Sequence, residues 1–448
     1  MDIPLRHFWR VKPQSVVSTV KNWKAVFSTV EKVVIGLLIA VIVFTVIGWI
    51  SQLTGGHAVV PRVGGSVEIG TVAPDGPGGV ELGRLTQSGL VKTDLSGNIL
   101  PDLSKNWTIS DDKLTYLFEL EDKISSSDIM MGFEKRPADF PNIKPKVTSL
   151  SGIKITLSEP QAGFLSDLAK PIFPLGPYKI GKQTDKEIRL TRNENYFSQK
   201  AYLDQITIKL YADQNALQDA ANSGKIDIAY DLDKIPNKWN KKIYNTSTVP
   251  MLFVNTSKSY FKKAGARTTL LEGKKPSGFN SIDVLEVNTD PNRFDPDYLK
   301  LKKAWKDAGL EVKERQEDVK TALTGSLLER DYDVLYIVLD QGYDRDPYKF
   351  YNSTQRSGTG QNFAELGDAE IDKATEESRT IIDPVKRNEK YDEIFKQVAD
   401  SGVSKVYKPI QLILAYNTRI KGIAPVSCIT KSDIFCIASG WYIRTQKK

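Results

Sequence analysis

The chain has 448 residues, enough for two or three domains that each bury their own core. Hydrophobic residues make up 40% of it and charged residues 26%, which excludes a wholly disordered chain. The net charge of +7 comes without a long basic run interleaved with aromatic residues, so no binding of nucleic acid is expected.

Histidine and cysteine are scarce. The two histidines, His7 and His57, precede the expected globular part, which removes the usual general base and the commonest metal ligand from it. With Cys428 and Cys436 as the two cysteines, no zinc or iron–sulfur ligand set can be assembled, and we expect no metal and no cofactor. The cysteine pair forms either one disulfide in an oxidising compartment or two separate thiols packed as small hydrophobic groups.

A charge-free segment near the N-terminus predicts a membrane span. Residues 33–50 read VVIGLLIAVIVFTVIGWI, which as a helix extends over roughly 27 Å, close to the thickness of the hydrocarbon layer. Lysine and arginine dominate the residues before it, and such a flank stays in the cytoplasm. We predict a basic cytoplasmic segment at 1–32, a transmembrane helix at 33–53 and a linker at 54–66, with the rest of the chain outside the cell membrane.

Two details of this N-terminal region leave alternatives. Apolar residues between 16 and 30 recur at spacings of four and three, which fits either a helix on the inner leaflet or a solvated basic tail. Gly56-His57-Ala58 has the small-x-small form that signal peptidase cleaves, but the apolar run and the leader are both longer than those of a signal peptide. A retained anchor is therefore favoured.

Short strands follow the linker, and then one pattern occurs twice. In KLTYLFELED, Leu114, Tyr116 and Phe118 alternate with polar residues, as in a half-buried strand. Further on, the strand DQITIKLY, a helix and the strand KIDIAYDL form one β-α-β unit. The strand GLEVKERQ, a helix with Asp318 as its N-cap and the apolar strand DYDVLYIVLD form a second unit. Each unit favours a mostly parallel sheet.

Two such units predict two lobes that close on each other. We place lobe I at 67–257, lobe II at 258–408 and a C-terminal return to lobe I at 409–448. Two helices separated by Pro384 are expected to pack on lobe II. Ligands bind in the crevice between such lobes, and closure traps them. The alternative is a pair of independent domains without a shared site.

Several long motifs resemble a known family. Residues 89–122, 176–229 and 343–379, together with the closing IKGI and WYIRT segments, are similar to the extracytoplasmic peptide-binding proteins of ABC importers, solute-binding protein family 5. The resemblance implies an α/β, bilobal, periplasmic-binding-protein-like (type II) clamshell, here preceded by one transmembrane helix. It also implies a non-enzymatic protein that captures a peptide or another amino-bearing solute for an ABC transporter permease.

This chain departs from the family pattern by being shorter in three places. The segment EDKISSSDIMMGFEK has lost residues, the helical insertion before GPYKI is reduced, and KKAGARTTLLEGKKPSGFNS is expected to be loop-like. These cuts favour an alternative in which the protein is a surface receptor, sensor or scaffold uncoupled from transport. An extracellular hydrolase has no support, because no nucleophile–base pair or catalytic carboxylate motif is present.

The resemblance also implies a location for the ligand. In the family, an acidic residue just ahead of an Asp-Pro step pairs with a peptide's α-ammonium group. We favour Asp344 for this role, because the loop in DQGYDRDPYKF follows a buried strand, where ligands bind in α/β sheets. The other predicted ligand-binding residues are Tyr343, Arg345, Asp346, Tyr348, Tyr351 and Asn362, with a surface or core role as the alternative for each.

Other acidic residues receive different interpretations. Asp340 lies in the same loop region as the favoured aspartate and is a further candidate, and Val80 and Glu81 are weak candidates for the cleft floor. Asp227 and Asp333, which occupy matching places in the two β-α-β units, are interpreted as structural because both begin a strand away from the crevice.

Overall fold

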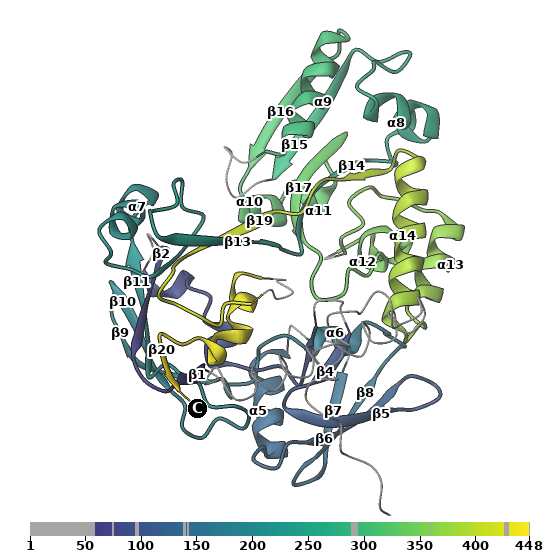
Figure 1. The fold of residues 1–448 in the computed structure, drawn as a ribbon. Helices are drawn as coiled ribbons and strands as arrows, with labels where there is room; N and C mark the ends of the chain where they lie inside the picture. The colour runs from purple at the N-terminus through teal and green to yellow at the C-terminus, as the bar shows by residue number, and fades with distance from the viewer. Residues whose placement is uncertain are drawn as a thin grey trace, which may run out of the picture. The chain divides into compact units, whose positions relative to one another are not determined.

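The computed structural model describes the chain from residue 59 to residue 447, with gaps at 74–75, 95–97, 138–139, 141–142, 288–293, 359 and 425–429 (Figure 1). The predicted segments 1–32 and 33–53 and the start of the linker lie outside the described residues. Within the described ranges, no helix is long and apolar enough to cross a membrane.

The chain divides into two compact units. One is formed by Met1–Pro61 with Thr445–Lys448, and its described residues lie in β1 (Val59–Arg62) and β20 (Arg444–Lys447), which pair with each other. The other unit runs from Arg62 to Arg444 and holds the remaining sheets.

A seven-stranded sheet carries the first predicted β-α-β unit. Its strands follow the order β13-β19-β12-β2-β11-β10-β9. The central strand β2 runs parallel to both β11 and β12, and the other pairs are antiparallel. The strands are β2 (Ser66–Val72), β9 (Tyr178–Gln183), β10 (Glu187–Arg192), β11 (Gln205–Tyr211), β12 (Ile228–Tyr230), β13 (Trp239–Asn245) and β19 (Gln411–Asn417).

The helix of this unit forms as the sequence predicts. Helix α7 (Gln214–Asn222) begins after Asp213, whose side chain accepts a hydrogen bond from the backbone N–H of Ala216 at 2.8 Å. It buries Leu217, Ala220 and Ala221 on one face, and Gly224 follows with a φ of 70°. The unit β11-α7-β12 is therefore confirmed.

A five-stranded sheet in the order β16-β15-β17-β14-β18 carries the second unit. Strand β15 lies between β16 and β17 and runs parallel to both, as β2 does in the first sheet. Both faces of β17 are covered, because alternate residues of it join two different core clusters. The strands are β14 (Thr248–Val254), β15 (Ser281–Val287), β16 (Glu311–Glu317), β17 (Val334–Asp340) and β18 (Ser404–Val406).

The helical face predicted for the second unit is only half correct. The helix breaks at Gly325 into α10 (Val319–Thr324) and α11 (Ser326–Glu329). Ala322 and Leu327 are buried, but Val319 and Leu323, expected on the same face, are 37% and 58% exposed. The break turns the first segment away from the direction that a continuous helix would keep.

Other helices pack around the second sheet. Pro384 begins α14 (Pro384–Asp400) as predicted, after the N-cap Asp383, and α14 packs on α13 (Ala369–Ser378) and near β18 (Figure 1). The segment expected to be loop-like, residues 262–281, forms the helix α8 over Ala264–Leu271, which corrects that part of the prediction. The remaining elements here are η3 (Ser259–Phe261), α8 (Ala264–Leu271), α9 (Pro296–Asp307), α12 (Tyr348–Tyr351) and η4 (Ser353–Gln355).

A four-stranded antiparallel sheet in the order β5-β6-β8-β7 forms a third part. The predicted alternation holds in β6, where Tyr116 and Phe118 are buried and Leu117 is 45% exposed. The elements of this part are β3 (Val91–Thr93), β4 (Ile99–Pro101), β5 (Ser104–Ile109), β6 (Thr115–Leu120), α5 (Ser126–Lys135), β7 (Ile143–Ser149), β8 (Gly152–Leu157) and α6 (Phe164–Asp167). Elsewhere lie η1 (Pro77–Gly79), α4 (Gly83–Thr86) and η5 (Lys431–Gly440), and the buried side chains of α4 and η5 join the core of the seven-stranded sheet.

Two connections join the seven-stranded and five-stranded sheets. Strand β14 pairs with β17 along its whole length from Thr248, although it precedes the lobe boundary predicted at residue 257. The second connection runs from β18 to β19, and the lobe limits at residues 257 and 409 stay predictions. The two connections are bonded to each other: Thr246 donates its N–H to the Ile410 carbonyl at 3.1 Å, and Ile410 donates to the Thr248 carbonyl at 2.9 Å.

Candidate functional site

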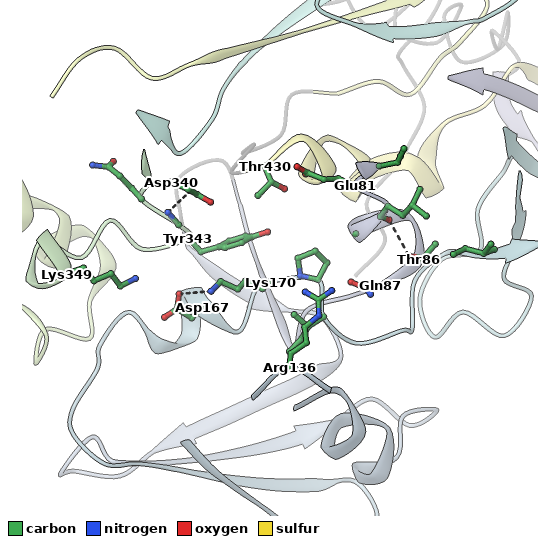
Figure 2. A pocket seen from close by; sticks show the side chains of 18 of the residues that line it. Glu81, Thr86, Gln87, Arg136, Asp167, Lys170, Asp340, Tyr343, Lys349 and Thr430 are labelled. Atoms are coloured by element: carbon green, nitrogen blue, oxygen red, sulfur yellow. Dashed lines mark hydrogen bonds and ion pairs between the residues drawn. The ribbon is translucent and has the colours of Figure 1, made fainter. Parts of the chain in front are cut away.

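A cavity of about 960 Å³ lies where the three sheet-bearing parts meet (Figure 2). One wall comes from the segment around α4, a second from the region of α5 and α6, and a third from the loop after β17. The charged residues that line it are Glu81, Arg136, Asp167, Lys170, Asp340 and Lys349. The cavity thus combines separate segments of the chain, as expected for a crevice between lobes.

The end of β17 supplies one wall through a tight turn. Asp340 closes the strand, and its carboxylate accepts a hydrogen bond from the N–H of Gly342 at 2.8 Å and another from the hydroxyl of Ser247. Gly342 has a φ of 74°, a left-handed conformation that favours glycine. The turn directs the following residue, Tyr343, into the cavity.

Tyr343 is the one predicted ligand-binding residue among those that line the cavity. Its hydroxyl donates to the Asp433 carboxylate at 2.7 Å, and burial raises the pKa of the Tyr343 hydroxyl. Arg84 donates from Nε to the same carboxylate oxygen at 2.9 Å and from Nη2 to the Ala169 carbonyl at 2.6 Å. This cluster ties the loop after β17 to α4 and to η5.

The favoured aspartate, Asp344, is turned away from the cavity. Its side chain is 7% exposed and accepts a hydrogen bond from the Tyr391 hydroxyl at 3.0 Å, with Arg387 Nε 3.6 Å away. Gly163 lies so close that a β-carbon there would come within 1.6 Å of the carboxylate. Burial raises the pKa of Asp344. Asp344 therefore does not line this cavity, and its contact with a ligand stays a prediction.

Asp346 is also buried, at 3% exposure, and faces Arg379, with 3.3 Å between Oδ2 and Nε. It accepts a hydrogen bond from the N–H of Tyr348 at 3.0 Å, and burial raises the pKa of Asp346 to about 6. The Arg379 guanidinium lies 4.3 Å from the centroid of the Tyr348 ring and 3.1 Å from the Glu159 carboxylate. Asp346 and Tyr348 therefore belong to an ionic cluster outside the cavity lining.

The other three predicted residues serve structural contacts. Arg345 pairs with Asp392 on α14 at 2.7 Å. Tyr351 is fully buried and its hydroxyl lies 2.8 Å from that of Ser404. Asn362, also fully buried, donates to three backbone carbonyls and accepts from the N–H of Leu366. None of the three lines the cavity, because tertiary partners hold each side chain elsewhere.

The weak candidates fare differently. Val80 and Glu81 line the cavity, and so does Asp340. Sequence reasoning missed Lys170 and Lys349, which also line it. Lys349 stands three residues after Asp346 in the predicted loop region, so its position carried a usable signal. Lys170 lies within the reduced segment before GPYKI, in which no motif is recognisable.

The two aspartates of the β-α-β units occupy matching structural positions. The Asp227 carboxylate accepts a hydrogen bond from the N–H of Glu68 in β2 at 3.0 Å. In the same way, the Asp333 carboxylate accepts one from the N–H of Asp283 in β15 at 2.9 Å. Each side chain thus ties its own strand to the central strand, away from the cavity.

The described residues offer no metal-binding arrangement, since none of them form a group of three or more histidine, cysteine or acidic side chains able to hold an ion. Cys436 is a free thiol, whereas Cys428 lies outside the described residues.

Comparisons with known proteins point in one direction. Residues 134–273 match the middle segment of the bacterial extracellular solute-binding proteins, family 5. The probable D,D-dipeptide-binding periplasmic protein DdpA of Escherichia coli is 22% identical over 430 residues, which cover 74% of this chain and 82% of that protein.

Two solved structures show the same fold. The ABC transporter substrate-binding protein CtaP of Listeria monocytogenes has a TM-score of 0.68 at 20% identity, covering 85% of this chain and 100% of that one. The oligopeptide-binding protein AppA of Bacillus subtilis, in complex with a nonapeptide, has a TM-score of 0.64 at 16% identity, covering 86% and 100%. The expected α/β, periplasmic-binding-protein-like fold is confirmed.

Proposed function

Because the chain belongs to the bacterial extracellular solute-binding proteins of family 5, we propose that it captures a peptide or a related amino-bearing solute and delivers it to the permease of an ABC transporter. Members of this family are extracytoplasmic. The proposed role is binding without chemical change, as in the solute-binding relatives.

The cavity is the observation that carries this proposal. Its volume of about 960 Å³ lies at the upper end of the range that small-molecule sites occupy, and its wall mixes apolar and charged side chains. The residues that line it come from the chain before the first inter-sheet connection, from the chain between the two connections and from the chain after the second. Rotation about two such short connections opens and closes a crevice without disturbing either sheet.

We further propose that residues 33–53 anchor the protein in the cell membrane, with residues 1–32 in the cytoplasm and the lobes outside. The charge-free run and the cationic flank of the sequence support this topology. Protease treatment of intact cells tests it: the lobes are degraded and a short N-terminal fragment survives. Release of an undegraded soluble protein lacking residues 1–58 contradicts a retained anchor.

Ligand binding is tested by thermal unfolding of the full chain against peptides of two to nine residues. A peptide at 100 times its Kd stabilises the native state by about 2.7 kcal/mol, which raises the Tm measurably. Gln87→Trp places an indole in the cavity and should abolish the shift, whereas Lys373→Trp, on the exposed face of α13, should retain it. A native protein whose Tm no peptide raises counts against peptide capture.

A receptor, sensor or scaffold uncoupled from transport is the second candidate, favoured by the shortened family motifs. Uptake of a labelled peptide by cells that have lost this protein separates the two. Unchanged uptake in those cells, with binding intact in vitro, favours the second candidate.

A further inference from the structure

The part of the molecule that holds the four-stranded sheet contacts the part that holds the five-stranded sheet, beside the cavity. The chain passes from the first part to the second only by way of the seven-stranded sheet and an inter-sheet connection. Movement about the two inter-sheet connections therefore separates these parts and breaks the contacts between them. Such contacts determine how readily the cavity opens.

One residue at the end of α13 makes two of these contacts. Ala162, in the segment between β8 and α6, donates its N–H to the carbonyl of Arg379 at 2.8 Å. Arg379 is the C-cap of α13, and the last carbonyls of a helix have no partner within it. The Arg379 guanidinium also lies 3.1 Å from the Glu159 carboxylate. Arg379 thus holds the four-stranded part through both its backbone and its side chain.

A glycine at this boundary shows how closely the two parts fit. Gly163 has a φ of −73° and a ψ of −2°, which any residue adopts, so its backbone does not require a glycine. Its neighbour does, because a β-carbon there would lie 1.6 Å from a carboxylate oxygen of Asp344, in the loop after β17. That carboxylate is held by the Tyr391 hydroxyl and faces Arg387. The close approach exists only while the two parts are in contact.

The preceding residue of the same loop adds apolar contact. The ring of Tyr343 packs against the core of the four-stranded part, and its hydroxyl donates to Asp433 of η5 at 2.7 Å. Bringing the parts together therefore removes apolar surface from water and satisfies polar groups at the same time. All the partners in these contacts belong to the chain, so the contacts form without a solute.

We propose that these contacts form a latch that keeps the cavity closed in the absence of a solute. The latch consists of Tyr343, Asp344 and Arg379 on the five-stranded part and of residues 159–163 on the four-stranded part. The inference goes beyond the proposed function, because it adds a step before capture: the latch opens, and only then does a solute enter. The stability of the latch sets the fraction of open molecules and with it the rate of solute entry.

Hydrogen exchange of the Ala162 amide measures this opening, because its N–H loses the Arg379 carbonyl when the parts separate. Exchange is followed by mass spectrometry at single-residue resolution on the full chain in detergent micelles, with no solute added. The amide should be protected at least about a hundredfold relative to an unstructured peptide. Gly163→Ala directs a methyl group at Asp344 and should speed the exchange at least about tenfold. Glu159→Gln removes one charge from a partly exposed pair and should speed it about twofold.

Gly265→Ala is the matched control, because it adds the same methyl group to α8, where the described part of the chain leaves open space around it. Exchange of Ala162 should not change in this variant, and the amides of β8 report whether the four-stranded part stays folded. Exchange of Ala162 in the unmodified protein as fast as in an unstructured peptide overturns the inference. So does an unchanged rate in Gly163→Ala with β8 still protected.

If Gly163→Ala also deprotects β8, the four-stranded part has unfolded and Glu159→Gln decides. A roughly twofold faster exchange of Ala162 in that variant then supports the latch, and an unchanged rate overturns it. None of these measurements involves a solute, so the latch and the capture of peptides are tested separately.

Discussion

Neutralising Asp433 should destabilise the protein strongly, because it leaves a buried guanidinium without its counter-charge. Arg84 is 8% exposed and Asp433 2% exposed, and 2.9 Å separate Arg84 Nε from the carboxylate oxygen. Asp433→Asn keeps the size and the hydrogen-bond acceptor but removes the charge. Breaking a buried ion pair in this way costs about 3–5 kcal/mol, since the remaining ion stays out of water.

The structure supplies two controls for this prediction. Tyr343→Phe removes the 2.7 Å hydrogen bond to Asp433 but keeps the ion pair, so it should cost only about 0.5–1.5 kcal/mol. Arg84→Met combined with Asp433→Leu removes both charges and should recover most of the loss, because a buried pair replaced by apolar groups is often neutral for stability.

The assay is urea unfolding of the full chain in detergent micelles, followed by tryptophan fluorescence. Trp441, one of seven tryptophans, is fully buried in the cluster that also holds Phe435, and its exposure on unfolding contributes to the signal. A cost below about 1 kcal/mol for Asp433→Asn, or a double variant as unstable as the single one, refutes the reasoning from buried charge.

Two further predictions concern the aspartates beside the cavity. Gly163→Ala should lower the free energy of unfolding in urea by about 1–3 kcal/mol, because the added β-carbon meets the Asp344 carboxylate. Gly265→Ala, with open space around it, should be neutral or stabilising. Equal effects of the two substitutions refute the steric argument. Burial raises the pKa of Asp346 to about 6, above the unfolded value of about 3.9, so the native state binds a proton that the unfolded chain releases between these pH values. The stability from this group is present below about pH 4 and is lost as pH rises through about 6, and Asp346→Asn should flatten the dependence of the unfolding free energy on pH in that window; an unchanged slope contradicts the assignment.

The β-α-β units were predictable from the sequence because their signals are local. Apolar alternation, an N-cap and a glycine stop fall within one short stretch for β11-α7-β12. In each unit a third strand lies between the two predicted ones, and the sequence did not predict it. In the first unit this strand is β2, which precedes the unit by more than a hundred residues and meets β11 and β12 only in the folded chain. Asp227 and Asp333 were interpreted correctly as structural, but their shared bond to the central strand depends on that insertion.

The sheet to which β14 belongs and the helical face of the second unit both depend on contacts that the local sequence does not contain. A strand is assigned to a sheet by its partners, and β14 finds its partners in β17 and β18, which come later in the chain. Helical periodicity assumed one continuous helix after Asp318, yet Gly325 divides it, so Val319 and Leu323 turn toward solvent. A local sequence pattern predicts whether a segment is a helix or a strand more reliably than it predicts which elements pack beside that segment.

The candidate site shows the same limit in its electrostatics. Asp344, Asp346 and Lys349 stand within one short stretch, and nothing local distinguishes which of them faces the ligand. The choice is made by Arg379 at the C-terminal end of α13 and by Arg387 in the first turn of α14, because a carboxylate leaving water needs a cationic partner. These arginines hold the aspartates inside, and the lysine is left to the cavity. Which side chains of this loop reach the cavity is therefore set by helices that do not line it.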